Sequence, residues 1–256
     1  RSDYLFITAP ENVAWLLNLR GKDNPHSPIP NCRLILKSNG KIYLFTNKSK
    51  IQHLLMKCNK MKIESIDESK IDFFLKNIVS KKIILDRLSC SLAYENIIKK
   101  KTNISIKNDP IYYMKSIKND TEIKHFIKSH IYDGVALIKF LCWIYNHKKN
   151  ITELDAKKKL SFFRMKNKNY LYPSFNTISA SGPNGAIIHY RANKSSNRLI
   201  KKNDMFLCDS GGQYKYGTTD VTRTITLGKQ TGKIKNIFTY VLKGHIAVAS
   251  ANLKKI

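Results

Sequence analysis

The sequence lacks several features that would assign it to a class at once. No apolar run approaches the roughly 18 residues of a membrane-spanning helix, so we expect a soluble protein. The five cysteines are odd in number and never form a CxxC pair, which excludes an obvious disulfide framework or zinc knuckle. These absences favour a reducing, cytoplasmic environment.

Acidic residues are also scarce. Lys and Arg number 46 against 18 Asp and Glu, and the formal net charge is +28. Such a charge is typical of proteins that bind nucleic acid or an acidic surface. Arginine, which forms the forks that read bases and phosphates, accounts for only 8 of the 46 basic residues. We therefore favour compositional drift toward lysine, and a basic nucleic-acid-binding protein is kept as an alternative.

The first part of the chain alternates strand and helix signals. Strands are predicted over residues 4–8, 33–37, 41–46, 61–65 and 82–86, and helices from residue 10 and over residues 47–57, 68–79 and 91–100. Asn39-Gly40 is a strong hairpin signal between two of these strands. The alternation predicts an α/β domain.

A turn at Asn108-Asp-Pro110 predicts a domain boundary. Beyond it, Asn119 and Glu122 have the form of a helix N-terminal capping pair. Apolar residues then recur at helical spacing and are expected to face the core: Ile123, Ile127, Ile131, Val135, Ile138, Leu141 and Cys142. His130 and Asp133 are interpreted as part of the polar face of this helix.

A stretch near the end of the sequence has the pattern of a site. A short buried strand is predicted over residues 205–208, ending on Asp209, and a β-branched return strand from Thr218 carries Asp220 near its start. If these strands pair antiparallel, the two carboxylates converge. Two close carboxylates repel unless a proton or cation lies between them, and oxygen donors favour a hard divalent metal. On spacing alone, the alternative that both aspartates only form the turn stays open.

Three segments have distinctive sequence motifs: ENVAWLLNLRGKD at Glu11–Asp23, FNTISASGPNGAIIHY at Phe175–Tyr190 and DSGGQYKYGTTDVTRT at Asp209–Thr224. Together they resemble the Xaa-Pro aminopeptidases, metallopeptidases of the pita-bread fold, and in particular their cytosolic multi-domain branch. The resemblance implies an α/β creatinase-like domain over residues 1–110, with its start missing. It also implies an α+β pita-bread catalytic domain over residues 111–256, truncated in its C-terminal half.

The resemblance further implies hydrolysis of the bond between an N-terminal residue and a following proline. In the family the first aspartate chelates one of two divalent metal ions and the second bridges both, which corresponds to Asp209 and Asp220 here. Manganese is the expected metal, and the pair of ions would polarise the scissile carbonyl and supply hydroxide at neutral pH. His189 matches the family's substrate-binding and catalytic histidine, which can stabilise an oxyanion. A cytoplasmic homodimer acting on peptides with proline in second position is implied, without membrane or nucleic acid as partner.

The sequence departs from the family pattern after Asp220. The family carries a metal-binding histidine and two glutamates farther downstream, but residues 228–256 contain no Asp or Glu. His245 matches a helix segment of the family that is not a metal ligand. We therefore expect a fragment that binds divalent metal weakly and is inactive alone. The second alternative is a non-catalytic pita-bread module that binds peptides or proteins, against which the retention of Asp209 and Asp220 argues.

Overall fold

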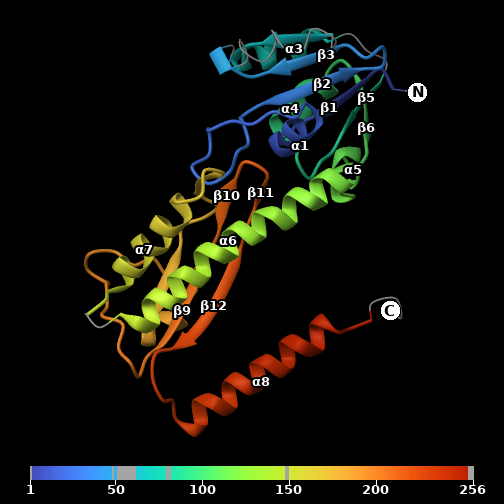
Figure 1. Ribbon diagram of the computed structural model, residues 1–256. Coiled ribbons are helices and arrows are strands. Elements are labelled where there is room, and N and C mark those ends of the chain that lie inside the picture. The colour runs from blue at the N-terminus through green and yellow to red at the C-terminus, as the bar shows by residue number, and fades with distance from the viewer. Residues whose placement is uncertain (1, 48, 51–61, 79–81, 148–149, 253–256) are drawn as a thin grey trace. The chain divides into compact units, whose positions relative to one another are not determined.

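The computed structural model describes residues 2–47, 49–50, 62–78, 82–147 and 150–252. The chain divides into two compact units, Arg1–Ile123 and Lys124–Ile256 (Figure 1). Among the described residues, no helix combines the length and the apolar character that crossing a membrane requires.

The first unit is built on a six-stranded mixed sheet of order β4-β3-β2-β1-β5-β6. Its strands are β1 (Tyr4–Ile7), β2 (Arg33–Lys37), β3 (Ile42–Phe45), β4 (Ile63–Ile66), β5 (Lys82–Leu85) and β6 (Asn103–Ile106). β2 pairs antiparallel with both β1 and β3, whereas the other neighbours are parallel. The remaining elements are α1 (Pro10–Leu16), the 3-10 turn η1 (Glu68–Lys70), α3 (Ile71–Asn77), α4 (Leu92–Lys99) and α5 (Pro110–Ser116).

Helices pack against both faces of this sheet. Successive residues of a strand point to opposite faces, so neighbouring residues join different core clusters. Phe6 belongs to a core cluster with residues of α3 and α4, including Leu75 and Ile98. Its neighbour Ile7 belongs to a second cluster with Val13 of α1 and Ile111 of α5. The predicted α/β domain is therefore a three-layer structure.

The predicted strands of this unit are all present within one or two residues at each end. β6 was not predicted, since its four residues carry only two apolar side chains between polar neighbours. The helix predicted over residues 47–57 lies largely outside the described residues.

The division between the units falls after Ile123 rather than near Pro110. Asp109 caps α5 by accepting a hydrogen bond from the amide of Ile111 (2.9 Å), and its other oxygen accepts one from Asn12 Nδ2 (2.7 Å). Ile111 is buried in the core of the first unit. These contacts group α5 with the first unit, although the turn before it reads as a boundary.

The second unit combines helices with two three-stranded sheets of order β11-β10-β7 and β12-β9-β8. Its helices are α6 (Asp120–Asn146), which begins in the last residues of the first unit, α7 (Glu153–Met165), the 3-10 turn η2 (Gly182–Ala186) and α8 (Gly232–Ala249). Its strands are β7 (Tyr170–Pro173), β8 (Ile178–Ser181), β9 (Met205–Ser210), β10 (Gly212–Tyr214), β11 (Gly217–Thr218) and β12 (Val221–Thr226). Phe140 of α6, Leu160 of α7 and Phe206 of β9 meet in its core.

The long helix α6 begins as predicted but buries a different face. Asn119 and Glu122 exchange backbone-to-side-chain hydrogen bonds of 2.9 Å, so the capping pair is confirmed. The buried residues of α6 are Ser129, Asp133, Ala136, Leu137, Phe140 and Ile144, whereas six of the seven residues predicted to face the core are exposed: Ile123, Ile127, Ile131, Val135, Ile138 and Cys142. The prediction was wrong because α6 has apolar residues around much of its circumference, and the buried face includes two polar residues that periodicity assigns to solvent.

We expect Leu137→Ala to lower the free energy of unfolding by about 2–5 kcal/mol, because it removes a buried side chain from the core. Its neighbour Ile138 is 62% exposed, and Ile138→Ala should change stability by no more than about 0.5 kcal/mol. Urea unfolding of the polypeptide 1–256, followed by circular dichroism, measures both. Equal losses would contradict the orientation of α6.

Candidate metal-binding hairpin

The hairpin of β9 and β12 pairs antiparallel over six residue pairs, with Asp209 opposite Thr222 and Ser210 opposite Val221. Asp220 immediately precedes β12, two residues before Thr222. If the alternation of side chains along β12 extends one residue beyond its start, Asp220 lies on the face that carries Thr222 and Asp209. Diagonal neighbours on one face of a sheet lie about 7–8 Å apart. The pairing therefore brings both aspartates to one end of the hairpin.

The environment of the two carboxylates suits a cation. Thr222 Oγ1 donates a hydrogen bond to Asp209 Oδ1 (2.7 Å), and Asp220 is exposed. Within the described residues, neither carboxylate forms an ion pair, although the chain carries 46 basic residues. Two uncompensated carboxylates on one face repel each other, and oxygen donors of this kind fit a hard divalent ion.

Cys208 does not extend this donor set. Its side chain lies on the opposite, buried face of β9, within the core of the second unit. Burial raises the pKa of the Cys208 thiol to about 11, so the thiol stays protonated at neutral pH. Anywhere in the described residues, including this hairpin, no group of three or more His, Cys, Asp or Glu side chains could hold a metal ion.

The segment between the aspartates is more than the simple turn that the sequence predicts. After Gly211 the chain leaves its first sheet, and β10 joins β7 while pairing with the short strand β11. The return strand predicted from Thr218 is consequently interrupted. Its first residue, Thr218, belongs to β11 in one sheet, and β12 belongs to the other. Asp209 and Asp220 therefore lie at the point where the chain leaves and re-enters the β12-β9-β8 sheet.

Gly211 is crowded at this crossing point. A Cβ atom there would overlap the carbonyl oxygen of Thr219 and Oγ of Ser174. Ser174 Oγ donates to that same carbonyl (2.8 Å), and the amide of Gly212 donates to Thr219 Oγ1 (2.9 Å). Thr219 directly precedes Asp220, so the start and end of the segment are bonded to each other.

His189 lies on a separate loop that follows β8 and η2. It is exposed and has a left-handed backbone, with φ 55°, a conformation that is uncommon for residues other than glycine. Within the described residues its imidazole forms no hydrogen bond. Ser181, where the loop starts, pairs with Phe206 rather than with Asp209. The strand register thus unites the two aspartates but does not by itself bring His189 to them.

The loop that carries His189 is anchored on Glu153, the first residue of α7. The Glu153 side chain is fully buried, and its carboxylate accepts hydrogen bonds from the Ser181 amide (2.7 Å), Asn184 Nδ2 (3.0 Å) and the Arg198 amide (3.1 Å). The Tyr190 hydroxyl lies 2.8 Å from Glu153 Oε2, and burial raises the pKa of Tyr190, which keeps the hydroxyl protonated. The role of Glu153 was not predicted from the sequence, where it has the pattern of an ordinary acidic residue in the first turn of a helix.

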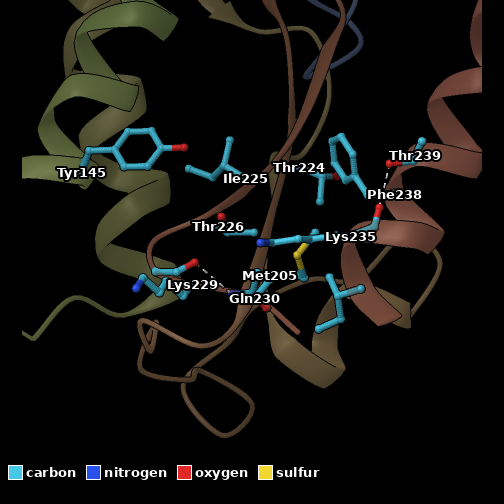
Figure 2. Close-up of a pocket in the computed structure, with 12 residues that line it drawn as sticks. Tyr145, Met205, Thr224, Ile225, Thr226, Lys229, Gln230, Lys235, Phe238 and Thr239 are labelled. Carbon is cyan, nitrogen blue, oxygen red and sulfur yellow. Dashed lines mark hydrogen bonds between the residues drawn. The ribbon is translucent and has the colours of Figure 1, made fainter. Parts of the chain in front are cut away.

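A groove of about 470 Å³ lies elsewhere in the second unit (Figure 2). It is bordered by β12 and α8, where Thr224 and Phe238 line it, and by Tyr145 of α6. None of its lining residues is Asp, Glu, His or Cys. It therefore offers no metal chemistry, and the candidate site remains the aspartate hairpin.

Family models match both units. The model of metallopeptidase family M24 matches residues 124–255, which is more than half of the chain. The chain belongs to metallopeptidase family M24. A model of the creatinase/prolidase N-terminal domain matches residues 1–122, and the two matched regions meet where the compact units divide. The expected fold class, an α/β creatinase-like domain followed by an α+β pita-bread domain, is confirmed.

Several Xaa-Pro aminopeptidases are similar to this M24 chain. The Xaa-Pro aminopeptidase ApepP of Drosophila melanogaster is 39% identical over 259 residues, which cover 97% of this chain and 42% of that protein. The X-prolyl aminopeptidase of Caenorhabditis elegans, described as a cytosolic enzyme with a di-nuclear active site, matches with a TM-score of 0.89 and 30% identity over 97% of this chain and 42% of that one. The prolidase of Pyrococcus furiosus shares the fold, with a TM-score of 0.72 and 22% identity over 94% of this chain and 67% of that one. The chain thus spans about two fifths of the length of the aminopeptidases.

We expect Gly211→Ala to destabilise the second unit by about 1–3 kcal/mol or more, because the new methyl group must displace backbone. Gly185→Ala is a matched control, since a Cβ there would lie 3.9 Å from Leu207 Cβ, an ordinary contact. Urea unfolding of both variants tests this. A Gly211→Ala protein as stable as the control would contradict the close approach of Gly211 to Thr219 and Ser174 in the structure.

Proposed function

We propose that the protein acts as an Xaa-Pro aminopeptidase that hydrolyses the bond between an N-terminal residue and a following proline at a dinuclear metal site. The observation that carries the proposal is the pairing of β9 with β12, because Asp209 lies at the end of this hairpin and Asp220 directly precedes β12, within the region matched by the M24 model. The similarity to aminopeptidases along 97% of the chain supports the same reaction.

The chain's own residues have defined tasks in this proposal. Asp209, oriented by the hydroxyl of Thr222, and Asp220 would hold the divalent ions. When bound, such ions supply Lewis acidity and lower the pKa of water to about 7. His189, whose imidazole has no hydrogen-bond partner in the described part of the chain, would bind the substrate and donate a hydrogen bond to the developing oxyanion.

Further properties belong to the same proposal. We expect manganese as the metal, since carboxylate oxygens suit it. We also expect a cytoplasmic homodimer acting on peptides with proline in second position. The description of the C. elegans relative as a cytosolic enzyme with a di-nuclear active site supports the location and the number of metal ions. The scarcity of arginine argues against nucleic acid as a partner.

In the full-length protein, His189→Ala should lower kcat/KM by roughly a hundredfold or more, as expected for loss of one oxyanion donor. The measurement is manganese-dependent release of the first residue from an Arg-Pro-Pro peptide. Ile188→Ala is the control, because Ile188 is the adjacent residue and is 86% exposed. Unchanged turnover in a folded His189→Ala protein would remove His189 from the mechanism.

The polypeptide 1–256 alone should release no residue from the same peptide and should bind manganese only weakly. Divalent ions of this kind are coordinated by about six ligands. The described residues contain no group of three or more potential metal-ligating side chains, so the two aspartates would have to bind the ions alone. Calorimetric titration with manganese gives the affinity. Robust manganese-dependent release that Asp220→Ala abolishes would show that residues 1–256 hold a sufficient ligand set.

A further inference from the structure

The second unit contains a buried ion pair that the proposed reaction does not use directly. Arg164 of α7 is 2% exposed, and its Nε and Nη2 donate to the two oxygens of Asp133 on α6 at 2.7 and 3.0 Å. Taking both charges out of water is costly, and such a pair is weak evidence for a stabilising role. Its other contacts indicate what it does.

The remaining donors of Arg164 reach the residues that directly follow Asp209. Nη2 lies 3.1 Å from Ser210 Oγ, and Nη1 donates to the carbonyl oxygen of Gly211 at 3.2 Å. These are the last residue of β9 and the residue at which the chain leaves the sheet. One guanidinium thus joins α6 and α7 to the backbone next to a proposed metal ligand.

Tyr214 completes the arrangement from the end of β10. Its hydroxyl donates to Asp133 Oδ1 at 2.8 Å. Burial, and then the neighbouring Asp133 carboxylate, raise the pKa of Tyr214, so the hydroxyl stays protonated and remains a donor. Asp133 is therefore held by Tyr214 as well as by Arg164, and the two ends of the segment Ser210–Tyr214 are bonded to the two partners of one buried ion pair.

We propose that Arg164, oriented by Asp133 and Tyr214, is a positioning residue for the aspartate pair. It fixes the direction in which the chain leaves Asp209, and so the separation of the Asp209 and Asp220 carboxylates and their affinity for two divalent ions. The inference rests on the proposed dinuclear site. Lysine cannot replace Arg164, because a single ammonium group cannot bond both Asp133 oxygens and the Gly211 carbonyl in the planar fork geometry.

The test measures manganese affinity of the full-length protein by competition with a fluorescent chelator, counting only folded protein. Arg164→Lys should weaken manganese binding about 10–100-fold, the range seen when partners that orient a ligand are lost. It should also change the electron paramagnetic resonance spectrum of the coupled manganese pair. Tyr214→Phe removes one hydrogen bond at nearly constant volume and should weaken binding less, by about threefold or more.

The matched control is Arg87→Met. Arg87 also makes a two-nitrogen contact with a carboxylate, that of Glu95, but this pair lies in the first unit and Arg87 is 58% exposed. Its loss should leave manganese affinity unchanged. A purely structural role for Arg164 predicts lower stability with unchanged affinity in the folded variant.

Manganese affinity of folded Arg164→Lys within twofold of the parent would overturn the inference. If Arg164 variants do not fold, unchanged affinity and spectrum in Tyr214→Phe would overturn it instead. A parent protein that binds no manganese would overturn the proposed function together with the inference. A parent that binds manganese and cleaves the peptide, beside unaffected variants, would overturn the inference alone.

Discussion

The antiparallel pairing of β9 with β12 is the constraint on which the candidate site depends. Side chains alternate along a strand, so a slip of one residue would exchange the two faces completely. Asp209 would turn into the core, and Phe206 and Cys208, now buried against α6, would turn outward. The hydrophobic core of the second unit therefore fixes the register, and the register fixes which carboxylates share the open face.

Buried polar groups extend this control to the loops. The chain has only 18 acidic residues, yet five of them are buried: Asp86, Glu95, Asp109, Asp133 and Glu153. A buried carboxylate is costly unless its oxygens are bonded. Glu153 collects donors from the loop that carries His189, and Asp133 binds the arginine that reaches the aspartate segment. Residues on the helices thereby fix the conformation of the His189 loop and of the segment after Asp209, whose own local conformational preferences are weak.

The elements predicted best from the sequence are those whose signal is local. Strands rich in β-branched and apolar residues, the capping pair at Asn119 and the hairpin carrying Asp209 and Asp220 need only neighbouring residues to be recognised. The crossing at Gly211 was missed, because the partner of β10 is β7, some forty residues earlier in the chain. Asp133 was assigned to solvent for the same reason, since only the folded chain shows that α7 brings a guanidinium to it.

The face of α6 shows a related limit. Helical periodicity locates an apolar stripe but does not tell which of two stripes on one helix is buried. The buried stripe is the one against which the other elements of the unit pack. Here the side with Asp133 packs inward, because Phe140 and Leu137 on the same side meet β9 while Asp133 meets Arg164. The buried charge pair and the hydrophobic contact therefore lie on the same face of α6.

The large positive charge also has a limited bearing on the site. Charges farther away than about 8–10 Å are largely screened at physiological ionic strength, so most surface lysines contribute little to the potential at the hairpin. Arg223, next to Thr222 on β12, lies opposite Cys208 in the register and donates to the backbone carbonyl of Thr222 (2.8 Å) rather than to an aspartate. The repulsion between Asp209 and Asp220 is therefore not offset by an ion pair within the described residues, and a bound proton or cation is what could offset it.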